Sequence, residues 1–126
     1  LEQDENNKSA LNNIGFLLKF KQYLTKASYL GHDRANNNLG FIYEKEGNIE
    51  LAKKYYQKAA DKNIVDAMNN LAYIYHLEGN TVLEKKYLTD AAYYDDDYAK
   101  YRLFYIYKEE GDFESAEQYL YHTYDN

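Results

Sequence analysis

A single fixed period constrains the fold of this chain more than any other feature of its sequence. Alanine, leucine, tyrosine and glycine return at a constant step of 32 from position 35 onward. The recurring sets are Ala35, Ala67 and Ala99; Leu39, Leu71 and Leu103; Tyr43, Tyr75 and Tyr107; Gly47, Gly79 and Gly111; and Tyr55, Tyr87 and Tyr119. A period in this range is typical of stacked helical units that bury their apolar faces against one another. The sequence therefore predicts a repeat protein.

The composition favours one all-α domain that spans residues 1–126. The chain contains no proline and only 6 glycines, which favours helices over many short strands joined by turns. Hydrophobic residues occupy 45% of the positions and charged residues 29%, as in globular proteins rather than disordered chains. We therefore expect an α-solenoid built of antiparallel helix hairpins.

Charge and residue content exclude several classes of function. The formal net charge of −6 argues against nucleic acid as a partner, because phosphate contacts need clustered Lys and Arg. No apolar run reaches the roughly 20 residues that a membrane span requires. Without cysteine there is no disulfide, thiolate metal site or Cys nucleophile. We expect a cytoplasmic location, although a chain that starts at Leu1 is also compatible with a removed signal.

The N-terminal region, residues 1–31, predicts one long helix. Its apolar residues recur every three or four positions, as Ala10, Ile14, Leu17, Phe20, Leu24, Ala27 and Leu30. Residues 10–16 repeat the pattern of residues 35–41 at a spacing of 25, whereas residues 23–27 repeat that of residues 55–59 at a spacing of 32. The difference between the two spacings is the length of about two helical turns, and it removes the turn of a hairpin. This region is interpreted as a partial repeat whose two helices are fused into one.

Three complete hairpins follow, in units predicted to span residues 33–64, 65–96 and 97–126. The expected helices cover residues 34–45 and 49–62, then 66–77 and 81–93, then 97–109 and 113–124. Gly47, Gly79 and Gly111 mark the hairpin turns, because ending a helix favours a residue at positive φ. Asn48, Asn80 and Asp112 follow these glycines and are expected to cap the second helix of each hairpin. Asp33 and the run Asp95–Asp97 are expected to cap the first helices.

These residues resemble the tetratricopeptide repeat and its Sel-like relatives. The first complete unit carries the motif as Ala35, Asn38, Leu39, Gly40, Tyr43, Gly47, Ala52, Tyr56 and Ala59. The period is shorter than the one usual in the family, which is about 34 residues. Ile64 and Asp96 stand near the place of the usual proline. The resemblance implies a right-handed solenoid that holds a peptide or partner segment in a concave groove lined by the first helix of each unit.

Carried onto this sequence, the resemblance implies a groove with two ladders of side chains. The groove positions are Asn12, Asn13 and Phe16; Asn37, Asn38, Phe41 and Glu44; Asn69, Asn70, Tyr73 and His76; and Tyr101, Arg102, Tyr105 and Lys108. A ladder of asparagines can donate to and accept from the backbone of any extended peptide. The aromatic ladder supplies contact area at low rotamer cost. Each ladder has an alternative interpretation. The asparagines could be scaffold residues of the repeat, and the aromatic residues could pack between units.

Two other roles remain open from the sequence. The apolar stripe of the long helix, with Leu17, Phe20 and Leu24, could form a homodimer interface, because the helix is longer than the hairpins it packs against. The chain could also be part of a longer solenoid. An enzyme is not expected, since no nucleophile motif or phosphate loop is present. His32, His76 and His122 lie in different units and lack a second ligand at i+3 or i+4, so neither a metal nor another cofactor is expected.

Overall fold

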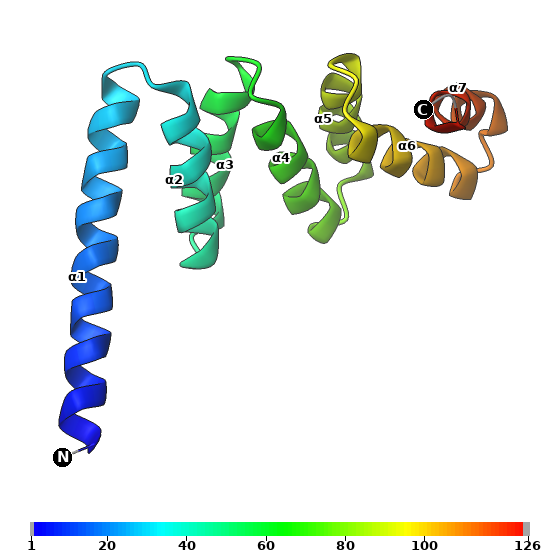
Figure 1. Ribbon diagram of the computed structural model, residues 1–126. Helices are drawn as coiled ribbons and strands as arrows, with labels where there is room; N and C mark the ends of the chain where they lie inside the picture. Colours follow the sequence, from blue (N-terminus) through cyan, green and yellow to red (C-terminus); the bar gives the residue numbers. More distant parts are fainter. Residues whose placement is uncertain (1, 125–126) are drawn as a thin grey trace.

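The computed structural model describes the backbone of residues 2–124 and the side chains of residues 14–119. All regular secondary structure in this part of the chain is helical. The helices are α1 (Glu2–Tyr29), α2 (Asp33–Lys45), α3 (Ile49–Ala60), α4 (Val65–Leu77), α5 (Thr81–Tyr93), α6 (Asp97–Glu109) and α7 (Phe113–Tyr124). Each helix packs mainly on its neighbours in the sequence, so the hairpins α2–α3, α4–α5 and α6–α7 follow one another in a row (Figure 1). The prediction of an all-α solenoid with one long helix and three hairpins is confirmed.

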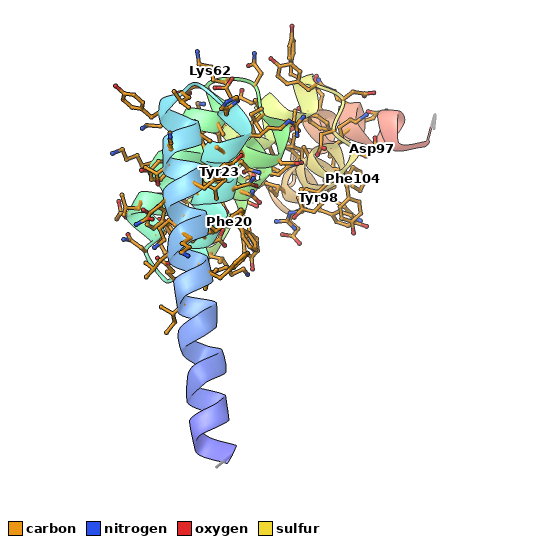
Figure 2. The ribbon with its side chains drawn as sticks, turned by 60° about the vertical axis from the view of Figure 1, so that its left-hand side comes forward. Phe20, Tyr23, Lys62, Asp97, Tyr98 and Phe104 are labelled. Carbon is orange, nitrogen blue, oxygen red and sulfur yellow. The ribbon has the colours of Figure 1, made fainter. Side chains whose placement is uncertain are left out.

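The predicted helix bounds differ from the observed ones by at most a turn. Helix α1 begins at Glu2 and contains 28 residues, which corresponds to a length of about 42 Å. Only its C-terminal half lies beside α2, while the N-terminal half extends beyond the hairpins (Figures 1 and 2). Helix α3 ends at Ala60 instead of residue 62. None of the described helices is long and apolar enough to cross a membrane.

The hairpin turns follow the predicted chemistry. Gly47, Gly79 and Gly111 have φ values of 83°, 75° and 80°, a region that side chains with a Cβ rarely adopt. The residue after each glycine then caps the next helix. Asn48 and Asn80 accept hydrogen bonds from the Leu51 and Leu83 N–H groups at 3.3 and 3.1 Å, and Asp112 accepts one from the Ser115 N–H at 3.1 Å. The three predicted caps are confirmed.

The turns between hairpins use a different residue type at each position. Gly31, Asn63 and Asp95 have φ values of 91°, 65° and 64°, and these three positions are themselves separated by the period of the repeat. Asn and Asp tolerate this left-handed conformation better than most residues, and this turn stands where the resembling repeats usually carry proline. The prediction that Asp33 caps α2 is wrong, because the N-cap position belongs to His32 and carries no side-chain hydrogen bond. Capping by the aspartate run is confirmed at Asp96, whose carboxylate accepts from the Ala99 N–H at 2.9 Å.

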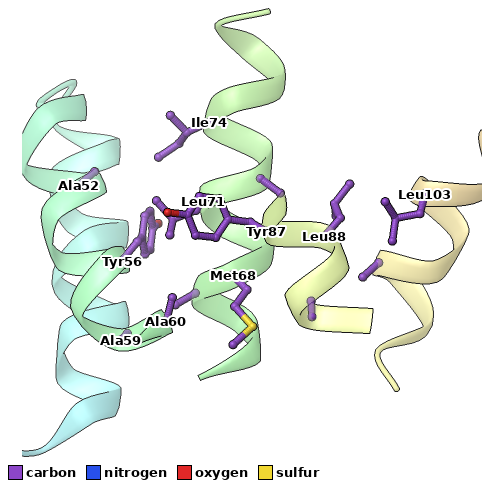
Figure 3. Close-up of a cluster of buried hydrophobic side chains, with 14 of the residues drawn as sticks. Ala52, Tyr56, Ala59, Ala60, Met68, Leu71, Ile74, Tyr87, Leu88 and Leu103 are labelled. Carbon is purple, nitrogen blue, oxygen red and sulfur yellow. The ribbon is translucent and has the colours of Figure 1, made fainter. Parts of the chain in front are cut away.

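The core follows the same period along the stack. Leu39, Leu71 and Leu103 are completely buried, and Tyr56 is the largest side chain among the fully buried ones. Figure 3 shows Tyr56, Leu71 and Tyr87 meeting between neighbouring helices, with Leu88 and Leu103 continuing the core toward α6. Gly40 is required under Tyr56, because a Cβ at this position would lie 2.5–2.8 Å from three atoms of the ring.

One contact between successive helices is repeated three times with the same geometry. Lysine side chains from α1, α3 and α5 pair with a glutamate at the end of the next α2, α4 or α6 and lie over a tyrosine ring of that helix. The pairs are Lys21–Glu46 at 2.6 Å, Lys53–Glu78 at 2.5 Å and Lys85–Glu110 at 2.9 Å, and the rings are Tyr43, Tyr75 and Tyr107 at 4.9–5.1 Å from the ammonium groups. The hydrogen bond to Glu78 raises the pKa of Lys53. Through Lys21, the C-terminal half of α1 makes the contact that α3 and α5 make.

Candidate functional site

Aromatic rings line one exposed side of α2, α4 and α6, here called the A-helix face. Phe41, Tyr73 and Tyr105 occupy the same position in the three helices and are 52%, 50% and 38% exposed. Tyr101 lies beside Tyr105 with its ring centroid 4.8 Å away, in an edge-to-face arrangement. Monomeric proteins normally bury rings of this size more completely, and aromatic residues are enriched in protein interfaces. The aromatic ladder of the sequence analysis is therefore solvent-accessible.

The asparagine ladder is partly engaged within the protein. The Asn70 side-chain amide donates to Asn37 Oδ1 at 3.0 Å, which links α4 to α2. The Asn69 amide donates to Asp96 Oδ2 at 2.9 Å, which links α4 to the start of α6. These bonds connect successive hairpins, and they also fix the orientation of each carboxamide. Asn38 is exposed on α2, whereas the side chains of Asn12 and Asn13 lie outside the described residues.

A pocket of about 160 Å³ opens on this face between α4, α5 and α6. It is lined by Asn69, Ala72, Tyr73, His76, Glu84, Leu88, Tyr98 and Arg102. Asn69 Oδ1 is buried and has no hydrogen-bond partner among the described residues. A buried acceptor without a partner costs about 1–3 kcal/mol, which a ligand that donates a hydrogen bond can recover.

Glu84 supplies the charge at the base of this pocket. It stands in the position that alanine occupies in the neighbouring hairpins, at Ala52 and Ala116, and it is only 4% exposed. Its Oε1 accepts from Arg102 Nη2 at 2.9 Å and lies 3.3 Å from His76 Nδ1. A buried carboxylate is tolerated when a cation neutralises it and hydrogen-bonds to it. The pocket therefore presents a neutral ion pair and not a free charge.

The equivalent place in the hairpin α2–α3 is filled by a tyrosine. Tyr56, the counterpart of Leu88, donates from its hydroxyl to Glu44 Oε1 at 2.8 Å, and Glu44 is the counterpart of His76. Burial, together with this hydrogen bond, raises the pKa of Tyr56 well above its usual range. The smaller Leu88 leaves the corresponding space open between α4 and α5, so the difference between these two side chains accounts for the pocket.

Sequence reasoning placed Tyr73, Asn69, His76 and Arg102 on one face, and the structure brings these four together around the pocket. It missed Glu84 and Tyr98 as members of the site. The signal for Glu84 was available, since a charged residue in a column of alanines must find a partner when buried. Among the described side chains, no cluster of His, Asp and Glu could hold a metal ion.

The three residues named as a possible oligomer interface lie along one stripe of α1, and α2 covers only one of them. Leu17 and Phe20 are exposed, at 48% and 39%. Leu24 is buried in a cluster with Ala35 and Leu39 of α2. The prediction that Leu24 contributes to an interface is therefore withdrawn, because α2 of the same chain already covers it.

Comparison with known families identifies the repeating unit. The family model of the Tetratricopeptide repeat matches residues 33–61, which comprise α2, the Gly47 turn and α3. No curated protein matches the chain. The match and the row of consecutively packed helices are consistent with a tetratricopeptide-like helical repeat, which is the resemblance that the sequence analysis stated. Repeats of this family generally serve as protein–protein interaction modules.

Proposed function

We propose that this protein is an adaptor that binds an extended segment of a partner protein along the A-helix face. The observation that carries the proposal is the column of exposed rings at Phe41, Tyr73 and Tyr105 next to a polar pocket. Exposed aromatic side chains of this kind provide most of the binding energy in peptide-binding grooves when a partner covers them. The column repeats from one hairpin to the next, so an occupant that runs across the helices contacts all three rings.

The pocket contributes selectivity to the proposed interaction. Its free acceptor is Asn69 Oδ1, and the neighbouring carboxylate of Glu84 is already neutralised by Arg102. A group that donates a hydrogen bond without carrying a full charge suits this environment, for example a hydroxyl, a carboxamide or a backbone N–H of the partner. A carboxylate suits it poorly, because it would face the buried carboxylate of Glu84 and the unpaired oxygen of Asn69.

The test begins with a peptide library that is screened for binding to the purified protein. The affinity of a selected peptide is then measured by fluorescence anisotropy for the wild type and for the Tyr73→Ala variant. The proposal predicts at least about a tenfold loss of affinity, as expected for an aromatic residue at the centre of an interface. Tyr73 is half exposed, so the change leaves the core intact.

The matched control is Tyr93→Ala, which removes a tyrosine that is 83% exposed at the end of α5 and does not line the pocket. Its affinity for the selected peptide is expected to equal that of the wild type. The double change of Asn37 and Asn69 to Ala tests the asparagine ladder, with far-UV helicity as the check on folding. Equal affinities of all four proteins would contradict binding at the A-helix face.

A further inference from the structure

The distance between neighbouring rings of the A-helix face is set by the packing of the helices that carry them. Asn70 of α4 donates to Asn37 of α2 at 3.0 Å, so side chains join these two helices directly. Helices in side-chain contact lie about 8–10 Å apart. Phe41, Tyr73 and Tyr105 occupy the same position in α2, α4 and α6, which follow one another along the stack (Figure 1). A partner that contacts all three rings must therefore offer one side chain about every 8–10 Å.

This spacing discriminates between the regular conformations of a partner segment. In a β-strand, side chains on one face recur at every second residue, about 6.6–6.8 Å apart, and residues three apart point to opposite faces. In a polyproline II helix, side chains on one face recur at every third residue, about 9.3 Å apart. An α-helix offers side chains seven residues apart on one face, at about 10.5 Å. The polyproline II spacing falls within the range of the rings, and the α-helical spacing lies just above it.

The pocket beside Tyr73 distinguishes the polyproline II helix from the α-helix. Asn69 Oδ1 is buried there and has no hydrogen-bond partner among the described residues. Beyond its first turn, an α-helix uses all its backbone N–H groups for its own hydrogen bonds. A polyproline II helix has no internal hydrogen bonds, so every residue in it other than proline has a free N–H group. A polyproline II segment can thus contact the rings with its prolines and donate to Asn69 from a residue between them.

We propose that the segment bound at the A-helix face is a polyproline II helix with a proline at every third position. This inference rests on the proposed binding of a partner at that face, and it names the conformation and composition of the partner. Each proline packs on one ring of the column Phe41, Tyr73 and Tyr105, as proline-rich segments do in aromatic-lined grooves. The hydroxyl groups of the two tyrosines donate to backbone carbonyl groups of the segment, which no internal hydrogen bond occupies.

Charge and entropy define the rest of the segment. Glu84 accepts a hydrogen bond from Arg102 at 2.9 Å, so the two charges next to the Asn69 acceptor neutralise each other. Neutral residues with a free N–H group, such as alanine and glutamine, therefore suit the positions between the prolines. Proline has a fixed φ, so a segment rich in proline loses less conformational entropy on binding than a flexible one.

Three fluorescein-labelled peptides test the spacing. All three have the same composition, with three prolines among alanine and glutamine, and their prolines stand at every second, every third or every fourth position. Fluorescence anisotropy measures their affinities for the wild type. The peptide with proline at every third position is expected to bind at least about tenfold more tightly than the other two, because only its prolines meet all three rings. Equal affinities, or tighter binding of another spacing, would overturn the proposal.

Two variants check that the preference for this spacing arises at the A-helix face. Tyr73→Ala removes the central ring of the column and is expected to abolish the preference. Tyr93→Ala removes a tyrosine that is 83% exposed and does not line the pocket, and it is expected to retain the preference. A preference that survives Tyr73→Ala would overturn the assignment of the prolines to the rings.

A fourth peptide represents the α-helical alternative. It is an alanine-rich helix with leucine at every seventh position, and it is expected to bind more weakly than the peptide with proline at every third position. Tighter binding of the helical peptide would overturn the proposal. Peptides selected from a library separate this inference from the proposed function. A selected peptide that depends on Tyr73 but lacks the three-residue spacing overturns this inference alone, whereas one that does not depend on Tyr73 contradicts the proposed function as well.

Discussion

Helix α1 and the hairpin α2–α3 carry the same columns of residues, but only the hairpin covers them. Leu39 is completely buried in the hairpin, whereas the matching Ile14 is half exposed on α1. The two regions have the same apolar pattern, and they differ by the short segment that holds the turn. The comparison teaches that the glycine turn, and not the apolar pattern, determines whether a repeat of this kind closes on itself.

The physical reason lies in the ends of the helices. Gly47 reverses the chain at positive φ, and Asn48 caps the helix that follows. Without these two residues, the shortest path continues the backbone hydrogen bonds of the helix straight through, because each added residue gains one bond. The apolar residues of α1 are then spread along a helix of about 42 Å instead of being folded against one another.

The largest expected effect is on the free energy of unfolding, and it differs between substitutions on the two sides of α1. Replacing Leu24 by Ala should lower the free energy of unfolding by about 3 kcal/mol, because it leaves a cavity between α1 and α2. Leu18→Ala is the matched control on the exposed side and should change it by less than about 0.5 kcal/mol. The two variants are compared with the wild type by urea unfolding. Equal losses for the two variants would contradict the assignment of the two sides.

A second comparison uses the glycines that match each other in the two regions. Gly40→Ala should destabilise the protein by about 2 kcal/mol, since the new Cβ would overlap the buried ring of Tyr56. Gly15→Ala should instead stabilise it by up to about 1 kcal/mol, because alanine favours the helix and nothing lies within 4 Å of its Cβ. The midpoints of thermal unfolding of the two variants, compared with that of the wild type, distinguish destabilisation from stabilisation. A loss of stability in both would show that Gly15 is also packed against a neighbour within the chain.

The smallest expected effect concerns the pH dependence of the caps. The Ser115 hydroxyl and N–H donate to Asp112 and lower the pKa of its carboxyl below the ordinary value of 3.8. Because the folded pKa is below the unfolded one, this cap stabilises the fold above pH 3.8 and is lost as the pH falls through the folded pKa. The caps of α3 and α5 are asparagines and do not titrate.

Amide hydrogen exchange at pH 5 and at pH 2.5 measures this difference. The first turn of α7 should lose protection at the lower pH to a greater extent than the first turns of α3 and α5, after correction for the intrinsic exchange rate. Asp112→Asn serves as the control, because it replaces the titrating cap by the residue type that the other two hairpins use. Identical changes in the three helices would contradict the assignment of Asp112 as a titrating cap.

The local parts of this fold could be predicted from the sequence. Gly47, Asn48 and their counterparts act through backbone conformation and capping, and both effects depend on residues within one turn. The shared position of Phe41, Tyr73 and Tyr105 was also predicted, whereas the sequence left open whether these rings line a groove or pack between units. A fixed period places each residue relative to its helix, which is sufficient for these features.

The predictions that were wrong and the site residues that were missed depend on contacts between helices. Leu24 and Phe20 lie in the same stripe of α1, and the sequence does not show that α2 covers Leu24 alone. The pairing of Glu84 with Arg102 joins α5 to α6, and the bonds from Asn69 and Asn70 join different hairpins. The left-handed turn residues Asn63 and Asp95 were overlooked, although Gly31, Asn63 and Asp95 form one column of residue types that adopt this conformation more readily than others.

The most direct test restores the missing turn in α1. Inserting Glu-Lys-Glu-Gly-Asn-Ile-Glu, the sequence of residues 44–50, between Leu18 and Lys19 brings the two segments of α1 into the spacing of α2 and α3. Small-angle X-ray scattering then compares the radius of gyration of this variant with that of the wild type. If the turn determines closure, the two segments of α1 fold into a hairpin and the radius of gyration is smaller than that of the wild type, despite the added residues. An equal or larger radius of gyration would contradict this account.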